Sequence, residues 1–263
     1  PKLFIGNKEY DHDKLNRDIG ALSGIFTALG LKEGMLICAV EERNYENLLL
    51  LLTCLEMNVT WLSLNPKHPK KLNQRIINEV TPNLICGTNN TFLVGITGDN
   101  QFFNVRSNLN YTTQIDYTTV LRNKKIFRTL VNVAYLITTS GTSGYPKTVK
   151  IEKSVFLSHI KNISKIYKYG EKDVVIQYSS LTFDAGLEQF FTPLLSGCTL
   201  IFRDEAKWGP IELKAAISKY AVTAINLPPA VLLSFCNYIE ENKQRNTIKS
   251  LKLIISDGTA FPL

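Results

Sequence analysis

Hydrophobic residues in the first part of the chain follow two alternating periodicities. Between Asp13 and Leu29 the apolar side chains recur at the spacing of one helical face, and Gly30 follows where a helix commonly ends. The runs Met35–Val40 and Thr60–Leu64 are short and apolar, which indicates buried strands. The other elements predicted here are helices from behind Asn44 to about Met57 and near Lys71–Val80, and a strand over Asn83–Cys86. Strands that alternate with helices predict a parallel sheet covered by helices.

The sequence between Gly87 and Arg128 is polar and rich in Asn and Thr, and its periodicity fades. We therefore expect a subdomain boundary within residues 87–130. Alternation then resumes, with strands predicted over Val131–Thr138, Thr148–Ile151, Val174–Tyr178, Thr199–Phe202, Val222–Asn226 and Leu251–Ile255, and helices over Ser154–Tyr167, Gly186–Leu195, Ile211–Tyr220 and Ala230–Ile239. The pattern predicts an α/β fold with two layered, mostly parallel sheets flanked by helices.

Composition narrows the class of protein. With 263 residues, of which 44% are hydrophobic, the chain is long enough to bury a substantial core. Its five cysteines are odd in number and lack a C-x-x-C pair, so neither a disulfide framework nor a thiolate zinc site is indicated, and a reducing, cytoplasmic setting is expected. The apolar run at Leu48–Leu52 is far shorter than the roughly 20 residues that span a bilayer, so no membrane span is expected.

The net charge of +7 is compatible with an anionic partner such as nucleic acid. The basic residues, however, come in short groups such as Lys70-Lys71 and are not interleaved with aromatic residues. A solvated basic face is the preferred interpretation, and no nucleic-acid partner is expected. The first residues contain neither an initiator Met nor a signal peptide, which favours a chain that begins inside a longer protein.

The segment Thr138–Lys147 has the strongest chemical signal, because it reads Thr-Thr-Ser-Gly-Thr-Ser-Gly-Tyr-Pro-Lys. Glycines allow backbone N–H groups to face an anion, hydroxyls add neutral donors, and the lysine adds a positive charge, a composition that suits a polyphosphate. A P-loop is rejected because Pro146 precedes the lysine and a strand, not a helix, is predicted next. The alternative interpretation is a flexible Ser/Gly hairpin loop.

Residues Ala134–Val149 resemble the signature loop of the adenylate-forming superfamily, which includes nonribosomal-peptide adenylation domains, acyl-CoA synthetases and luciferases. Further segments resemble other motifs of that superfamily in the same order: Tyr10–Asn16, Leu55–Pro69, Phe183–Gly197 and Ser256–Pro262. The chain is most similar to the N-terminal part of a nonribosomal peptide synthetase adenylation domain. Residues 1–263 are accordingly interpreted as a partial AMP-binding domain.

The resemblance implies that a carboxylate attacks the α-phosphorus of ATP, giving an acyl-adenylate and pyrophosphate, with Mg²⁺ offsetting phosphate charge. The acyl group would then pass to a thiol, either coenzyme A or the phosphopantetheine of a carrier protein. By position, the nucleotide would be held by Thr139, Ser140, Gly141, Thr142, Ser143, Gly144 and Lys147, with Gly258 near the reactive centre. Lys147 is the expected catalytic residue.

The same resemblance places a substrate-binding carboxylate at Asp184, where amino-acid-activating members pair with the α-amino group of the substrate. The alternative is that Asp184 caps a helix beginning near Ala185. The residues expected to shape the side-chain pocket are Ala185, Glu188, Asn226, Ile255 and Asp257. For Glu188 an exposed place on an amphipathic helix is an equal alternative.

Several positions depart from the superfamily pattern. Thr148 replaces a glycine, Lys153 stands where histidine is frequent, and Thr259 replaces a glutamate. His159 is expected to be a satisfied, partly buried histidine. The later motifs of the superfamily do not occur before Leu263, so residues 1–263 alone are not expected to complete adenylation. Two other functions stay open: an acyl- or aryl-CoA ligase, and a degenerate, non-catalytic nucleotide-binding module.

Overall fold

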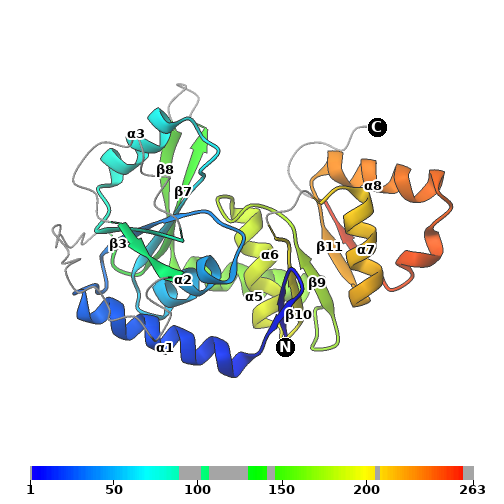
Figure 1. The fold of residues 1–263 in the computed structure, drawn as a ribbon, viewed down its shortest axis with the longest axis horizontal. Helices are drawn as coiled ribbons and strands as arrows, with labels where there is room; N and C mark the ends of the chain where they lie inside the picture. Colours follow the sequence, from blue (N-terminus) through cyan, green and yellow to red (C-terminus); the bar gives the residue numbers. More distant parts are fainter. Residues whose placement is uncertain (1, 89–101, 107–129, 141–145, 205–207, 257–263) are drawn as a thin grey trace. The chain divides into compact units, whose positions relative to one another are not determined.

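The chain forms two compact units, each built on its own sheet (Figure 1). The computed structural model describes residues 2–88, 102–106, 130–140, 146–204 and 208–256. Unit 1 comprises Pro1–His12 and His159–Leu263, and unit 2 comprises Asp13–Ser158. The predicted α/β fold with mostly parallel sheets is confirmed. The chain passes between the units at residues 12–13 and 158–159, and within the segment 87–130 the described residues 102–104 form a strand of the same sheet as the strands before and after it.

Unit 2 contains a six-stranded sheet, sheet B, in the order β6-β5-β3-β4-β7-β8. Its strands are β3 (Leu36–Val40), β4 (Thr60–Leu64), β5 (Leu84–Gly87), β6 (Phe102–Asn104), β7 (Val133–Ser140) and β8 (Pro146–Glu152). Neighbouring strands are parallel except β7 and β8, which form an antiparallel hairpin. The central strand β3 is buried along its whole length, which explains its continuous apolar sequence.

Helices cover both faces of sheet B. They are α1 (His12–Ala28), α2 (Tyr45–Glu56) and α3 (Lys70–Val80). On one face Ile76 and Ile77 of α3 join the core formed by alternate residues of the strands, among them Leu36 and Cys38. On the other face Phe26 of α1 meets Phe103 edge to face, with 5.5 Å between ring centroids. The two periodicities of the sequence therefore correspond to helices packed on a central sheet.

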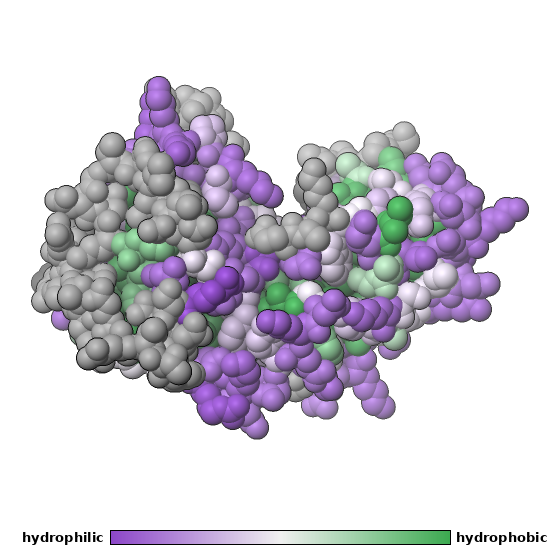
Figure 2. Space-filling view, viewed as in Figure 1, coloured by the Kyte–Doolittle hydropathy of each residue, from purple (hydrophilic) through white to green (hydrophobic). Residues whose placement is uncertain are grey.

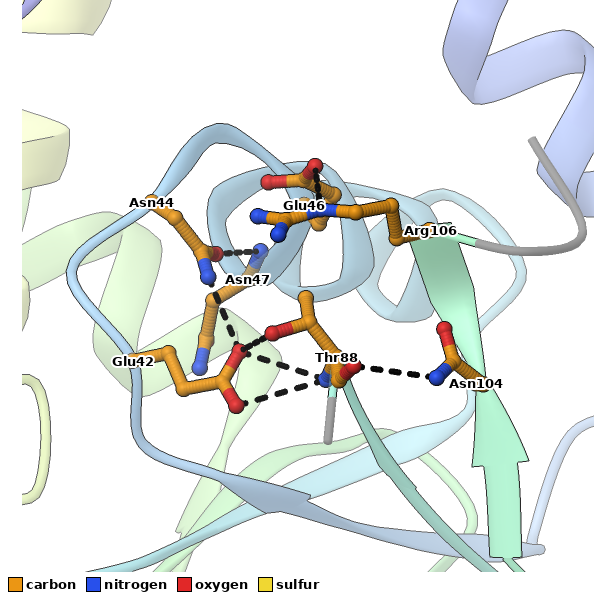
Figure 3. A network of polar contacts seen from close by, with 7 residues as sticks. All are labelled: Glu42, Asn44, Glu46, Asn47, Thr88, Asn104 and Arg106. Carbon is orange, nitrogen blue, oxygen red and sulfur yellow. Dashed lines mark hydrogen bonds and ion pairs between the residues drawn. The ribbon is translucent and has the colours of Figure 1, made fainter. Parts of the chain in front are cut away.

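A polar network joins β3 to β5 where these strands end, at the carboxyl edge of sheet B (Figure 3). The Glu42 carboxylate accepts hydrogen bonds from the Thr88 backbone N–H, at 3.2 Å, and from the Thr88 hydroxyl. It also accepts one from the Asn44 side chain at 2.8 Å. Asn44 in turn caps α2, because its side-chain oxygen accepts the Asn47 N–H at 2.9 Å. The predicted helix start behind Asn44 is confirmed.

The same network extends to β6. Asn104 donates its side-chain N–H to the Thr88 carbonyl at 2.9 Å, and Arg106 forms an ion pair with Glu46 of α2 at 2.8 Å (Figure 3). These contacts connect the end of β6 with the end of β5 and with the first turn of α2. They satisfy polar groups that would otherwise be left where the strands end.

Unit 1 contains a second six-stranded sheet, sheet A, in the order β12-β11-β9-β10-β1-β2. Its strands are β1 (Leu3–Ile5), β2 (Lys8–Tyr10), β9 (Val174–Gln177), β10 (Thr199–Phe202), β11 (Ala224–Asn226) and β12 (Leu253–Ile255). All neighbours are parallel except β1 and β2.

The helices of unit 1 are α6 (Asp184–Leu195), α7 (Pro210–Tyr220), α8 (Pro229–Glu241), a short 3-10 helix (Arg245–Ile248) and the greater part of α5 (Lys153–Tyr167). Helices α7 and α8 pack on the face of sheet A that carries Ile176, Ile201 and Ile225. Phe190 of α6 contacts Phe202 with a centroid distance of 6.4 Å. Phe202 alternates with Ile201 along β10, so α6 lies on the opposite face.

Strands β1, β2 and β6 were not among the predicted elements. In β1 and β2 the Gly6-Asn7 pair forms the turn, Ile5 pairs with Lys8, and Gly6 has φ +58°. A glycine-asparagine pair between short runs is a hairpin signal, because glycine adopts positive φ without strain. β6 has no such local signal, since it is a three-residue strand beside a long polar segment.

Three further features relate to the composition. All five cysteines are free thiols, and burial raises the pKa of Cys38 and Cys54 well above the usual range of a thiol. On the face seen in Figure 2 the described residues are mainly hydrophilic, with hydrophobic residues in separate small areas.

Within the described ranges, none of the helices combines the length and the apolar character needed to cross a bilayer.

Asp173 joins three strands at the amino edge of sheet A. Its carboxylate accepts the Thr223 hydroxyl at 2.8 Å and the Gly170 N–H at 3.0 Å, and it lies 3.5 Å from the Lys252 ammonium. Burial raises the pKa of the Asp173 carboxyl, but the hydrogen bonds from Thr223 and Gly170 and the charge of Lys252 outweigh it. The net pKa lies below the ordinary value of 3.8.

We predict that replacing Asp173 makes unfolding less sensitive to acid. A carboxyl whose pKa is lower in the folded state stabilises the protein above its unfolded pKa and loses that contribution as the pH falls through the folded value. The Asp173→Asn variant should therefore show a smaller loss of unfolding free energy below about pH 4. Urea unfolding between pH 7 and pH 3 measures this loss. Glu33→Gln, at an exposed position, is the matched control, and identical acid profiles for Asp173→Asn and the unsubstituted protein would contradict the prediction.

Candidate functional site

Asp184 lies at the start of α6, after the turn that follows β9. Phe183 is the N-cap residue and Asp184 is the first residue of the helix. The helix therefore begins one residue earlier than in the alternative interpretation, in which Asp184 is the cap of a helix that begins near Ala185. The Asp184 carboxylate is exposed and accepts the Ala185 N–H at 2.8 Å. It forms no ion pair within the described residues. A carboxylate in the first turn is also stabilised by the helix dipole.

The turn between β9 and α6 is held by two buried amide side chains. Gln189 of α6 accepts the backbone N–H groups of Tyr178 and Ser179 at 3.0 and 2.9 Å, and donates to the Ser179 hydroxyl at 3.0 Å. Gln177 at the end of β9 donates to the Ser179 and Gly186 carbonyls at 2.6 and 3.1 Å. These bonds connect the strand, the turn and the helix, and so fix where Asp184 lies.

Gly186 allows the turn to pass directly over the first turn of α6. A Cβ atom at this position would lie 1.9 Å from the Ser180 carbonyl oxygen, which belongs to the backbone and has no flexible end to move aside. Only glycine permits this approach. The place of the Asp184 carboxylate therefore depends on a residue two positions further along the helix.

Asn226 and Ile255 are direct neighbours at the carboxyl edge of sheet A. They are paired in the parallel register of β11 and β12, with Asn226 buried and Ile255 half-buried. The Leu227 N–H donates to the Ile255 carbonyl at 3.0 Å, and the Ser256 hydroxyl donates to the Leu227 carbonyl at 3.0 Å. Because β9 is the other neighbour of β11, the turn before Asp184 leaves from this same edge. Open α/β sheets bind ligands at this edge.

Glu188 is neither exposed nor unpartnered. Its side chain is 15% exposed, one carboxylate oxygen lies 2.7 Å from Nε2 of His159, and the other accepts the Tyr167 hydroxyl at 2.9 Å. The alternative of an exposed position on an amphipathic helix is therefore wrong. His159 is satisfied, as expected, and half of its side chain is exposed, because it reaches from α5 to α6 and not into a core.

The described residues of the hydroxyl- and glycine-rich segment, which are 138–140, 146 and 147, lie at one end of the β7–β8 hairpin in unit 2. Thr139 pairs with Lys147 and Ser140 with Pro146, and the Thr139 hydroxyl lies 3.4 Å from the Lys147 carbonyl. The strand predicted after the lysine is confirmed, which supports the rejection of a P-loop. The Lys147 side chain is exposed. The hairpin thus holds both ends of the predicted phosphate loop at the carboxyl end of β7.

Lys153, one of the departures from the superfamily pattern, has a structural partner. Its ammonium donates to the Leu55 carbonyl at 3.1 Å and to the Asn58 side-chain oxygen at 2.6 Å. Both acceptors lie at the carboxyl end of α2, where a cation is stabilised by the helix dipole and by carbonyls left without helical partners. The lysine therefore fastens α5 to α2 within unit 2.

Six of the predicted positions lie outside the described residues. They are Gly141, Thr142, Ser143, Gly144, Asp257 and Gly258. Thr259 of the following turn lies outside them as well.

Sequence reasoning did not find Gln177, Gly186 and Gln189, which hold the turn before Asp184. Gly186 was taken as the first residue of a predicted helix. A glycine in a helix is a usable signal, because it costs about 1 kcal/mol relative to alanine and indicates a close packing contact. The two glutamines carry no comparable signal. A buried amide and an exposed one look alike in the sequence, and only the turn geometry distinguishes them.

Comparison with known proteins shows which protein family the sequence matches. Residues 2–263 match the model of the family described as "AMP-binding enzyme". Enterobactin synthase component F of Escherichia coli (strain K12) is 24% identical over 100% of this chain, which spans 20% of that protein. Among solved structures, VinN in complex with L-aspartate superposes with a TM-score of 0.83 at 17% identity, over 100% of this chain and 66% of VinN.

A second solved structure is the nonribosomal peptide synthetase FmoA3 with bound α-methyl-L-serine-AMP. Its TM-score is 0.81 at 18% identity, over 99% of this chain and 28% of FmoA3. At these identities the two structures establish the fold. The chain thus spans a small part of the curated relative and about two thirds or less of these solved structures.

We predict that Gly186→Ala destabilises unit 1, because the added Cβ collides with the Ser180 carbonyl oxygen. The free energy of unfolding should fall by about 1–3 kcal/mol, the usual cost of overpacking. Gly24→Ala is the matched control, since Gly24 also lies in a helix but has open space around its Cβ position. That control should gain up to about 1 kcal/mol from helix propensity. Equal gains for both variants, measured by urea unfolding, would contradict the predicted contact.

Proposed function

Because the chain belongs to the AMP-binding enzyme family, we propose that it activates the carboxylate of an amino acid with ATP. The products are an aminoacyl-adenylate and pyrophosphate, and the aminoacyl group then passes to the phosphopantetheine thiol of a carrier protein. The chain supplies the substrate-binding and phosphate-binding part of a longer adenylating enzyme. The cytoplasm, where ATP and carrier proteins occur together, is the proposed location.

The observation that carries this proposal is the exposed Asp184 carboxylate at the carboxyl edge of sheet A. A substrate ammonium group requires an ionised carboxylate, and Asp184 forms no ion pair with any described residue. The amino-acid ligands in VinN and FmoA3 are compatible with such a partner. Asn226 and Ile255 lie at the same edge and, together with Ala185, Glu188 and Asp257, would shape the side-chain pocket.

The β7–β8 hairpin is the proposed phosphate-binding element. Thr139, Ser140 and Lys147 stand where its two strands lead into the connecting segment. Gly141, Thr142, Ser143 and Gly144 follow Ser140 in the sequence of that segment. Backbone N–H groups, hydroxyls and one ammonium would hold the β- and γ-phosphates of MgATP, and Gly258 would lie near the α-phosphate. Catalysis would then rest on positioning the carboxylate for in-line attack and on stabilising the developing charge.

We predict that Asp184→Ala selectively weakens the use of amino acids. Loss of a charge-assisted hydrogen bond of about 1.5–3 kcal/mol should lower kcat/KM for the best amino acid by about 10- to 100-fold. Pyrophosphate exchange in the full-length enzyme measures this, with the amine-lacking analogue of the same acid as the reference substrate. An equal loss for both acids would assign Asp184 a structural role in the first turn of α6. Better turnover of the amine-lacking acid by the unsubstituted enzyme would favour an acyl- or aryl-CoA ligase.

We predict that Lys147→Ala raises the KM for MgATP by at least about tenfold, because a charged contact to phosphate is lost. Lys150→Ala is the matched control, since Lys150 is an exposed lysine on the same strand. Thermal unfolding without nucleotide shows whether either variant is misfolded. Unchanged MgATP affinity in Lys147→Ala would remove the phosphate-loop assignment. MgATP binding without exchange for any acid would indicate a non-catalytic nucleotide-binding protein.

A further inference from the structure

A His-Glu-Tyr cluster joins α5 to α6 in unit 1. The Glu188 side chain is 15% exposed and each of its carboxylate oxygens has a partner on α5, Nε2 of His159 at 2.7 Å and the hydroxyl of Tyr167 at 2.9 Å. The His159 side chain is 50% exposed, so the cluster lies near the surface. A second contact between the same helices, the Ser164 and Ser196 hydroxyls at 2.6 Å, fixes their pairing further along.

Glu188 stands one helical turn after Asp184. Residues four apart in a helix share a face, about 5–6 Å apart, so the two carboxylates project on the same side of α6. Asp184 is exposed and forms no ion pair among the described residues, whereas Glu188 is enclosed and has two donors. One face of α6 therefore carries one carboxylate ready for a cation and one already occupied.

We propose that His159 and Tyr167 are positioning residues that hold Glu188 away from the substrate, so that the enzyme selects an amino acid with an uncharged side chain. This inference rests on the proposed function, because it places the side chain of the bound amino acid along the face of α6 that follows Asp184. Neither His159 nor Tyr167 contacts the reacting atoms. Both act through the carboxylate that they bind.

The physical basis is competition for one carboxylate. Glu188 offers an attractive partner for a lysine- or ornithine-like side chain only if its oxygens can turn toward that side chain. Here each oxygen already receives a donor, and the low exposure of the carboxylate makes the approach of a hydrated ammonium group costly. Removing the His159 donor frees one oxygen and exposes the carboxylate. The substrate preference should then move toward cationic side chains.

The test compares amino acids in pyrophosphate exchange with the full-length enzyme. The panel contains ornithine and lysine, uncharged residues of similar length such as norleucine and glutamine, and the amine-lacking analogue of the best substrate. The variants are His159→Ala, Tyr167→Phe, His159→Gln and the double variant His159→Ala/Glu188→Gln. Lys161→Ala, at an exposed position of α5, is the matched control. Thermal unfolding without ligand checks the fold of each variant.

We expect the unsubstituted enzyme to prefer an uncharged amino acid. In His159→Ala the kcat/KM ratio of cationic to uncharged substrate should rise about tenfold, mainly through KM, and Tyr167→Phe should shift it in the same direction. His159→Gln, which keeps a donor, should restore the original ratio. The double variant and Lys161→Ala should not show the rise. A general effect on stability would change all substrates together and would leave these ratios unaltered.

Two results would overturn the inference while the proposed function stands. These are a cationic preference in the unsubstituted enzyme, and an unchanged ratio in both His159→Ala and Tyr167→Phe. If instead the amine-lacking acid is the better substrate, or no acid supports exchange, the proposed function fails and the inference fails with it. Because Tyr167→Phe removes one hydroxyl only, it provides the answer even if His159→Ala does not fold.

Discussion

The start of α6 depends on one close approach between two stretches of backbone. The carbonyl of Ser180 lies where a side chain at position 186 would begin, so the turn after β9 rests directly on the helix. Gln177 and Gln189 then satisfy the polar groups that this compact turn leaves, which keeps the buried amides and the backbone hydrogen-bonded. A carboxylate on the first residue of the helix is thereby held by rigid elements and not by a mobile loop.

Both units place the residues proposed to bind substrate or nucleotide at the same kind of location. In unit 1 the residues Asp184, Asn226 and Ile255 stand where parallel strands end or just beyond, and in unit 2 the β7–β8 hairpin continues past the end of β4. Parallel strands bury their lengths under helices, so the carboxyl edge is where side chains and backbone N–H groups remain accessible. The residues that form the two cores are therefore different from the residues proposed for ligand binding, which lie at the strand ends.

The sequence predicted most helices and strands within a few residues, because each has a clear apolar periodicity. It missed β1, β2 and β6, which have three residues each, too few to show a periodicity. β1 pairs with the distant β10, β2 pairs with β1, and β6 pairs with β5. Asp184 and the segment Thr138–Lys147 were proposed as site residues from local composition and resemblance. The partners of Glu188 and Lys153 were not, since hydrogen bonds between separate helices leave no pattern at either residue.

The order of strands along the chain has a consequence for how the protein folds during synthesis. The six strands of sheet B are all contained in residues 36–152, so unit 2 can close once its own segment has left the ribosome. β1 pairs with β10, as Leu3 with Leu200, and has no parallel neighbour until almost two hundred further residues are made. Until then one edge of β1 is unpaired. The chain between β1 and β10 forms a long loop, and because closing it is slow, we expect sheet A to form late in folding.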